Sequence, residues 1–425
     1  MLSNDGTANA PGEIAPCVDA PSCRLLFVNR FFYPDSSATS QLLSDVAFHL
    51  ARIGYDVHVV ASSSRRERVP ADARVHGVRI HRVPAPDLAR LGLPGRLLEY
   101  CAFYLGASLA MRRLARRGDI IVAKTDPPMI GTLAGVAAWS RGARLVTWVQ
   151  DFYPEVAARL DVPLLNGPVG RLLAMLRDAT LRRAEINVVI GDDMAALALA
   201  RGASSRSLRV IANWADDLEI KPAPPARAAL RERHDLQDVF IVGYSGNLGR
   251  AHEYDTILEA ADLLRGEKGL RFLQIGGGVC VAEMRKKLRA RGLEGMFLFL
   301  PHQPRGELGD SLTAPDAHWL SLRPELEGLI VPSKFYGIAA AGRPVIAIVS
   351  EAGEIARILR REYCGVVIAP GAAVQLADAI LRLKADPELC ERMGANARRL
   401  IDDRYSKWMA LEKWAELFAS LTTSD

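Results

Sequence analysis

Short apolar runs alternate with longer amphipathic stretches along most of the chain, a pattern that indicates strands alternating with helices. In the first half, the runs that we predict as strands are Arg24–Asn29, Asp56–Ala61, Val78–Val83, Asp119–Ala123, Arg144–Val149, Glu185–Ile190 and Ser207–Ile211. The helices that we predict among them are Ala38–Arg52, Leu97–Arg117, Met129–Ser140 and Asp192–Ala200. This alternation predicts an α/β domain with a doubly wound, parallel sheet.

A second series of the same kind follows a break in the pattern. Residues 213–238 contain Pro222, Pro224, Pro225 and many charges, a composition typical of a linker. The strands that we predict after this linker are Val239–Tyr244, Arg271–Ile275, Met296–Leu300, Ala317–Leu320, Pro344–Ile348 and Gly365–Ile368. The chain therefore has the pattern of two successive α/β domains.

The end of the chain is predicted to be helical from residue 372 to residue 420, with breaks near Asp386–Pro387 and Tyr405–Ser406. We place the first domain at residues 23–212 and the second at residues 239–404. Two Rossmann-like sheets that face each other leave a central cleft at the carboxyl ends of their strands, where ligands bind in open α/β sheets.

Length and composition fit this organisation. A chain of 425 residues is too long for one ordinary core. The six cysteines are scattered without a CxxC pair, which favours reduced thiols in a cytoplasmic protein over disulfides or zinc. No apolar run predicts a transmembrane helix. Residues 1–22 lack the features of a signal peptide, and we predict that they form a disordered tail.

The net charge of +5 is unevenly distributed, because residues 65–117 contain twelve arginines and four acidic residues. One interpretation is a solvated basic face. The alternative is a surface for anionic lipid headgroups or a lipid diphosphate at the inner face of the cytoplasmic membrane. The predicted helix Leu97–Arg117 has apolar residues beside terminal arginines, which suits an interfacial helix, or equally a buried core helix with a basic end. Nucleic acid is not expected, because a recognisable binding fold and interleaved aromatic residues are lacking.

One segment, Leu322–Ala347, joins several features of a phosphate-binding site. Glu327 precedes a turn led by Gly328, where its carboxylate is placed to accept hydrogen bonds from sugar hydroxyls. Ser333 and Lys334 follow a proline and begin a helix, whose free amide groups and positive dipole end attract phosphate. Lys334 adds a mobile positive charge. From the pattern alone, an ordinary βα unit with a well-formed helix start remains the alternative.

This segment resembles the donor-site signature of retaining glycosyltransferases of family 4, which have the GT-B fold. It is similar to the branch that builds bacterial surface polysaccharides such as colanic acid and O-antigen. The similarity extends from about Arg24 to about Leu421. It implies that a last helix, within residues 405–425, crosses back to the first domain, and that the donor is a nucleotide-sugar, with UDP as the expected nucleotide. The residues of this segment that we predict to bind the donor are Glu327, Gly328, Leu329, Ile330, Ser333 and Lys334.

Three further loops of the second domain resemble donor-binding loops of the family. The loop after the first strand has the family's phosphate-binding pattern, in which glycines allow close backbone approach and Arg250 can bind a diphosphate bidentately. Gly277 stands in a strand-to-helix turn where the family often has aspartate. The next loop is similar to the one that cradles the nucleobase. The donor-binding residues predicted in these loops are Gly246, Asn247, Gly249, Arg250, Gly277, His302 and Gln303.

Loops of the first domain are predicted to face the acceptor or the donor sugar. The loop Gln150–Glu155 follows a strand and resembles a family loop, although capping of the next helix is an alternative role for its acidic residues. The opening loop near Ser36 lies where relatives carry glycines under the donor phosphate. The residues predicted on this side are Ser36, Ser37, Asp126, Gln150 and Asp151.

The resemblance also implies a mechanism. Asp151, Arg250, Glu327 and Lys334 are the predicted catalytic residues. Retaining transfer in the family proceeds by front-side attack, with the leaving diphosphate assisting deprotonation, so catalysis depends on positioning and on stabilisation of that diphosphate. The sequence has no DxD, HExxH or Walker motif. Neither a metal nor a cofactor is expected.

One departure from the family pattern supports other hypotheses. Gly337 stands where the family has a glutamate that binds ribose hydroxyls of the donor. Loss of that carboxylate is expected to cost about 1.5–3 kcal/mol of donor binding. A binding or scaffold protein with a weakened donor site is therefore the alternative, and a sugar-nucleotide epimerase on the same fold is a third hypothesis. The motifs leave the donor sugar, the linkage and the acceptor open.

Overall fold

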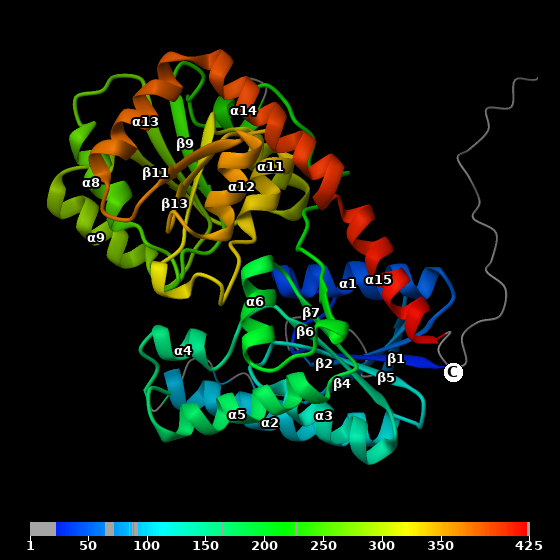
Figure 1. The fold of residues 1–425 in the computed structure, drawn as a ribbon. Coiled ribbons are helices and arrows are strands. Elements are labelled where there is room, and N and C mark those ends of the chain that lie inside the picture. Colours follow the sequence, from blue (N-terminus) through cyan, green and yellow to red (C-terminus); the bar gives the residue numbers. More distant parts are fainter. Residues whose placement is uncertain are drawn as a thin grey trace, which may run out of the picture.

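The computed structural model describes residues 23–63, 72–84, 92–163, 165–225 and 228–422, together with positions 86 and 88. The predicted tail, residues 1–22, and part of the basic stretch 65–117 lie outside the described residues. Figure 1 shows two α/β domains with helices on both faces of each sheet, and a C-terminal helix that reaches from the second domain to the first. This is the predicted fold class.

The first domain contains an eight-stranded sheet in the order β3-β4-β2-β1-β5-β6-β7-β8. Its strands are β1 (Arg24–Val28), β2 (Asp56–Ser62), β3 (Asp72–Val75), β4 (Val78–Val83), β5 (Ile120–Lys124), β6 (Arg144–Val149), β7 (Ile186–Val189) and β8 (Leu208–Val210). All pairs are parallel except β3–β4. The central strands are buried on both faces, which explains their continuous apolar runs. Strand β3 was not predicted, because its alternating charged residues form no apolar run.

Two helical layers cover this sheet (Figure 1). The helices of the domain are α1 (Ala38–Arg52), α2 (Gly92–Leu114), α3 (Ile130–Arg141), α4 (Glu155–Arg159), α5 (Pro168–Arg183) and α6 (Asp192–Ala200). Helices α2 and α3 share one core cluster with the sheet, and α3 also packs against α5. Helix α1 packs on the other face. Helix α5 was not predicted from the sequence, and α4 was expected only as the helix that follows the loop Gln150–Glu155. The predicted helix Leu97–Arg117 begins earlier, at Gly92, and ends at Leu114.

The second domain contains a six-stranded parallel sheet in the order β11-β10-β9-β12-β13-β14. Its strands are β9 (Phe240–Ser245), β10 (Leu270–Ile275), β11 (Phe297–Leu300), β12 (Ala317–Ser321), β13 (Val345–Ile348) and β14 (Gly365–Ile368). Its helices are α7 (Ala229–Arg233), α8 (Asp255–Leu263), α9 (Val281–Arg291), α10 (Leu308–Thr313), α11 (Lys334–Ala340), α12 (Glu354–Glu362), α13 (Ala373–Ala385) and α14 (Pro387–Leu400). The predicted strands agree with the observed ones to within one or two residues.

Helix α15 (Lys407–Thr422) leaves the second domain and lies on the first, against α1 (Figure 1). It follows a π-helical turn, Ile401–Tyr405, at the second predicted break. Trp414 and Phe418 of α15 are fully buried, and Phe418 meets Phe27 of β1 edge to face at 6.1 Å. The ammonium of Lys407 bonds to Asp45 and to Asp216, at 2.7 and 2.9 Å. These contacts tie the end of the chain to the first domain.

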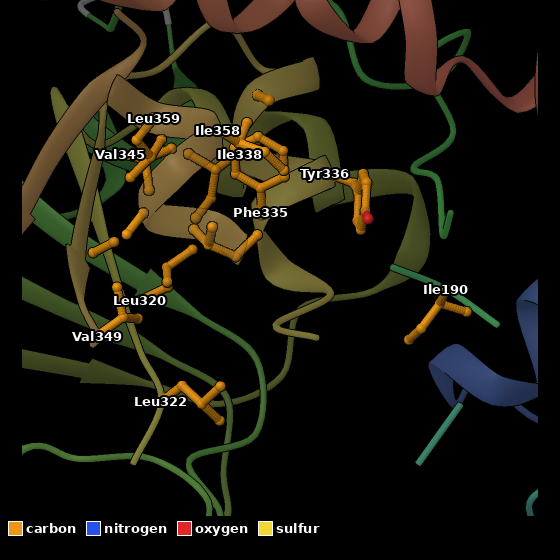
Figure 2. Packing of buried hydrophobic residues seen from close by; sticks show 14 of the residues in the cluster. Ile190, Leu320, Leu322, Phe335, Tyr336, Ile338, Val345, Val349, Ile358 and Leu359 are labelled. Atoms are coloured by element: carbon orange, nitrogen blue, oxygen red, sulfur yellow. The ribbon is translucent and has the colours of Figure 1, made fainter. Parts of the chain in front are cut away.

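A shared apolar cluster closes the boundary between the domains. It joins Phe152 and Ile190 of the first domain to Leu322, Leu329 and Tyr336 of the second. Figure 2 shows Ile190 across from Tyr336, with the other labelled residues packed around α11 and β13. Burial of large apolar side chains on both sides stabilises this arrangement of the domains by about 25 cal/mol for each Å² removed from water. The loops that carry the predicted site residues meet at this boundary.

Candidate functional site

The loop after β6 touches the loop before α11 across the domain boundary. Asp151 forms an isolated antiparallel bridge with Ile330, and the backbone N–H of Phe152 donates to the carbonyl oxygen of Leu329 at 2.9 Å. These residues come from the two loops that sequence analysis assigned to opposite sides of a cleft. The structure therefore brings the predicted acceptor side and the predicted donor side together.

Three loops of the second domain meet at the carboxyl ends of β9, β10 and β11. His302 Nε2 accepts from the backbone N–H of Gly277 at 3.2 Å and lies 3.1 Å from the side-chain oxygen of Asn247. Gln303 bonds within its own loop, to the carbonyl oxygen of Pro301 at 2.9 Å. Asn247, Gly277 and His302, predicted from separate motifs, thus form one exposed wall.

These loops approach each other so closely that one position must be glycine. Gly278 has a φ of +126°, and a Cβ there would lie 2.3 Å from the carbonyl oxygen of Leu248. The backbone N–H of Leu248 in turn donates to the carbonyl oxygen of Gly277 at 2.8 Å. The Gly-rich turn after β10 therefore supports the loop that holds Asn247.

Two cations, Arg250 and Lys334, face this region without an acidic partner. Neither forms an ion pair with a carboxylate in the described part of the chain. Arg250 is exposed at the end of its loop. Lys334 is mostly enclosed, and burial lowers its pKa to about 8. Uncompensated positive charge of this kind attracts an anion such as a diphosphate.

The predicted helix start at Ser333 and Lys334 is the start of α11. The helix has seven residues and begins at Lys334, with Ser333 exposed before it. The amides of Phe335 and Tyr336 donate to the carbonyl oxygens of Pro332 and Ser333, at 3.2 and 3.3 Å. Two amides at the start of the helix are therefore paired within the chain, and the side chain of Lys334 adds a positive charge to this part of the site.

Glu327 lies in the turn before α11, beside Gly353. A Cβ on Gly353 would come within 2.5 Å of its carboxylate, so the two residues are in close contact. Burial raises the pKa of Glu327 to about 7, with Asp193 and Glu354 adding to the effect, while Arg357 and the N–H of Ser350 oppose it. At neutral pH Glu327 therefore exists in both protonation states and can donate or accept a hydrogen bond. The neighbouring Gly328 faces Asp193 of the first domain, whose Cβ would lie 3.6 Å from an added Cβ.

Carboxylates and a buried lysine gather at the ends of β5 and β6. Burial raises the pKa values of Asp126 and Asp151 to about 6, and the ammonium of Lys124 opposes the shift in both. Lys124 is 1% exposed, donates to the carbonyl oxygen of Thr39 at 2.9 Å and lies 4.1 Å from the ring centroid of Trp148. Burial lowers its own pKa to about 7.

A pocket lies beneath Asp151, between α3 and α5. It contains about 450 Å³ of space, including the part open to solvent. Lys124, Asp151 and Arg177 line it together with threonines and apolar side chains. Arg177 is already paired with Glu155 at 2.7 Å, and Lys124 and Asp151 are the other charged residues of this lining.

The other residues predicted in the first domain have partners within the protein. The side-chain nitrogen of Gln150 donates to Oδ1 of Asn213 and its side-chain oxygen accepts from Nδ2 of Asn213, each at 3.0 Å, so Gln150 links its loop to the start of the linker. Ser37 caps α1 by accepting from the backbone N–H of Ser40 at 3.4 Å. Ser36 is exposed and its carbonyl oxygen accepts from Gln41. The side chain of Gln150 is therefore not free to bind the donor sugar in this conformation.

Comparisons with known proteins show the family of this chain. Residues 39–214 match the family model of a glycosyl transferase 4-like domain, and residues 226–400 match that of glycosyl transferases group 1. The probable glycosyltransferase WbjE of Pseudomonas aeruginosa is 30% identical over 339 residues, which cover 78% of this chain and 82% of WbjE. The chain belongs to the family 4-type glycosyltransferases.

A second relative of this glycosyltransferase is the putative colanic acid biosynthesis glycosyl transferase WcaI of Escherichia coli (strain K12). It is 32% identical over 207 residues, which cover 47% of the glycosyltransferase and 50% of WcaI.

Solved structures confirm the predicted GT-B fold of the glycosyltransferase. Anabaena Alr3699/HepE, solved in complex with UDP, superposes with a TM-score of 0.71 at 16% identity over 93% of this chain and 100% of its own. Sucrose-phosphate synthase from Thermosynechococcus elongatus superposes with a TM-score of 0.75 at 17% identity over 95% of this chain and 100% of its own. At such identities the likeness establishes the fold alone.

Two features of the glycosyltransferase bear on the hypotheses that sequence analysis left open. A Cβ on Gly337 would lie 3.4 Å from the Cδ1 of Leu312, an ordinary van der Waals distance, so the position has room for a Cβ. Among the described residues, no group of three or more His, Cys, Asp or Glu side chains is arranged to hold a metal ion. Metal independence stays a prediction.

Sequence analysis missed two residues of the site, Lys124 and His252. Lys124 directly follows the predicted strand Asp119–Ala123, in a loop that was placed near the acceptor, but Asp126 was the residue of that loop named as a site residue. His252 follows Arg250 by two residues and contacts Lys334, at 3.2 Å. No local pattern predicts that contact, because Lys334 is distant in the sequence.

Proposed function

We propose that this glycosyltransferase moves a sugar, with retention of anomeric configuration, from a UDP-sugar to a lipid-linked or membrane-presented glycan in surface polysaccharide biosynthesis. The observation that supports the donor most directly is the pair of uncompensated cations, Arg250 and Lys334, beside the Gly-rich loops. The structures of Alr3699/HepE with UDP and with UDP-glucose favour UDP, because that protein shares the fold.

In the proposed reaction, the acceptor hydroxyl forms its bond to the anomeric carbon on the face from which UDP departs. The bond to the diphosphate oxygen breaks, and the hydroxyl proton passes to that diphosphate. Arg250 and Lys334 stabilise the negative charge that develops on the leaving group. Glu327 and Asp151, with their raised pKa values, hold sugar and acceptor hydroxyls by hydrogen bonds.

The acceptor is proposed to enter the pocket beneath Asp151. The apolar part of its lining comes from Ala123, Met129, Val149, Phe152 and Leu181, and Lys124 and Asp151 line it as well. Such a combination suits a glycan whose sugar reaches the carboxylate while its lipid carrier lies along apolar surface.

The outer face of α2, α3 and α5 is the proposed membrane contact. The described helices include none that is long and apolar enough to span a bilayer. Large apolar side chains nevertheless point outward from all three neighbouring helices, with exposed fractions of 65% for Leu105, 85% for Trp139 and 66% for Met175. Exposed arginines follow on the same helices: Arg112 and Arg113 end α2, Arg141 ends α3, and Arg182 and Arg183 end α5. An apolar surface bordered by arginines fits a bilayer that contains anionic lipids.

Calorimetric titration with UDP, GDP, dTDP and ADP in the presence of EDTA tests the donor proposal. Micromolar binding of UDP, with weaker binding of the other nucleotides, is expected. Transfer is then tested with UDP-sugars, and consumption of a UDP-sugar without any acceptor would favour the epimerase. A folded protein that binds none of the nucleotides would favour the scaffold hypothesis, which is motivated by Gly337 in place of the family glutamate.

Vesicle flotation tests the membrane proposal. The variant Leu105→Glu/Met175→Glu should bind phosphatidylglycerol-containing vesicles at least tenfold less than the wild type, because each apolar side chain contributes to insertion. Leu263→Glu, at a 59% exposed leucine of α8 in the second domain, is the matched control. Equal flotation of the wild type with neutral phosphatidylcholine vesicles would contradict the role of the arginines.

A further inference from the structure

The protonation of His252 follows from its two ring contacts. Its Nδ1 lies 2.9 Å from the carbonyl oxygen of Ser321, at the end of β12. Because a carbonyl oxygen can only accept, Nδ1 carries the ring hydrogen and donates it. In the neutral ring, Nε2 is then bare, and it faces the ammonium of Lys334 at 3.2 Å. Nε2 therefore accepts a hydrogen bond from Lys334.

The position of this ring is fixed by the surrounding structure. His252 lies between β9 and α8, two residues after Arg250, and the neighbouring carbonyl of Ala251 accepts from the backbone N–H of Arg323 at 2.9 Å. The ring meets that of Tyr244 edge-on, with centroids 5.9 Å apart. Burial and the nearby charge of Lys334 lower the pKa of His252 to about 4, so the ring is neutral at physiological pH.

Lys334 depends on this neighbour for its orientation. Its stem lies against Gly246, where a Cβ would be 3.0 Å from its Cε, and its ammonium lies 5.1 Å from the ring centroid of Tyr244. His252 Nε2 is the hydrogen-bond acceptor that holds the ammonium among the described residues. The remaining N–H groups of the ammonium are free for a ligand.

We propose that His252 is a positioning residue, whose bare Nε2 holds the ammonium of Lys334 where the diphosphate of the donor binds. This inference rests on the proposed function. A neutral acceptor suits the task better than a carboxylate, because it orients the ammonium without cancelling its charge. Lys334 thus keeps its full attraction for the diphosphate.

The tautomer provides a test that needs no ligand. Nitrogen-15 NMR of histidine-labelled protein at pH 7 should show one ring that is protonated at Nδ1 and bare at Nε2, and His252→Gln should remove its signals. Lys334→Met should shift the Nε2 resonance of this ring, because the hydrogen bond from the ammonium is lost. A ring protonated at Nε2 would overturn the role of His252 and leave the proposed function intact.

Titration with UDP and with uridine tests the role in binding. His252→Leu should weaken UDP binding about tenfold, the size of one hydrogen bond to a charged group, and leave uridine binding unchanged. His252→Gln, whose amide oxygen can accept from Lys334, should restore most of the affinity. In the Lys334→Met background, His252→Leu should have no further effect, because both substitutions remove the same interaction.

The outcomes separate this inference from the proposed function. Equal loss of UDP and uridine affinity in His252→Leu would indicate a merely structural role, and additive losses in the double variant would also contradict the inference. A wild-type protein that does not bind UDP at millimolar concentration would overturn the proposed donor site itself, and with it the role of His252 in diphosphate binding.

Discussion

Gly337→Glu tests whether a carboxylate at this position completes the donor site. Gly337 lies within α11, outside the left-handed backbone region, and an added Cβ would lie at an ordinary contact distance of 3.4 Å from Leu312. The family glutamate at this position binds ribose hydroxyls, and a hydrogen bond to a charged group contributes about 1.5–3 kcal/mol. We therefore expect the variant to bind UDP about 10- to 100-fold more tightly than the wild type.

Gly337→Ala is the matched control, because it adds the Cβ without the carboxylate. Both variants should raise the free energy of unfolding by up to about 1 kcal/mol, the difference in helix propensity between glycine and these residues. In calorimetric titrations only Gly337→Glu should tighten UDP binding, and 2′-deoxy-UDP should show a smaller gain. The reasoning is refuted if Gly337→Glu binds UDP no better than Gly337→Ala does, or gains equally for 2′-deoxy-UDP.

Three further predictions concern the donor site, the Gly-rich turn beside it and the C-terminal helix. Burial lowers the pKa of Lys334 to about 8, so its charge is complete below pH 7 and is lost as the pH rises above 8. The affinity for UDP, measured by calorimetry, should therefore fall as the pH rises through 8 in the wild type and not in Lys334→Met. Gly278→Ala should lower the free energy of unfolding by at least about 1–3 kcal/mol, the cost of its backbone conformation, since the added Cβ would also clash with Leu248; an unchanged denaturant midpoint would contradict this. Trp414→Ala should lower that free energy by about 3–5 kcal/mol in chemical denaturation, because the fully buried ring joins α15 to the first domain; a loss below 1 kcal/mol would mean that α15 is dispensable for stability.

Much of the fold could be predicted from local patterns. The central strands are buried on both faces, so their sequences are continuous apolar runs. Such runs are recognisable without any tertiary information. The break at Asp386–Pro387 is confirmed by the end of α13 at Ala385 and the start of α14 at Pro387. Proline and charge clusters interrupt helices through local physics, which explains why such boundaries were accurate.

The elements that were missed have patterns that depend on their surroundings. Helix α5 carries exposed Leu172 and Met175 on its outer face, so its apolar residues do not follow the single stripe of an ordinary surface helix. Strand β3 lies at the edge of its sheet, where polar residues are tolerated and no apolar run is needed. In both cases, the position of the element in the folded molecule explains why its sequence lacks the usual pattern of apolar residues.

The sequence by itself determined the two α/β domains, their boundary and the loops that carry glycines, Arg250, Glu327 and Lys334, because these depend on periodicity and on local turn chemistry. Only the tertiary structure decided which of these groups act together. Packing of loops within the second domain brings His252 to Lys334, and the fold of the first domain brings the side chain of Gln150 to Asn213, at the start of the linker. Burial in that assembled site moves the pKa values of Asp151 and Glu327 toward neutrality, and burial is a property of the packed molecule rather than of any segment of the chain.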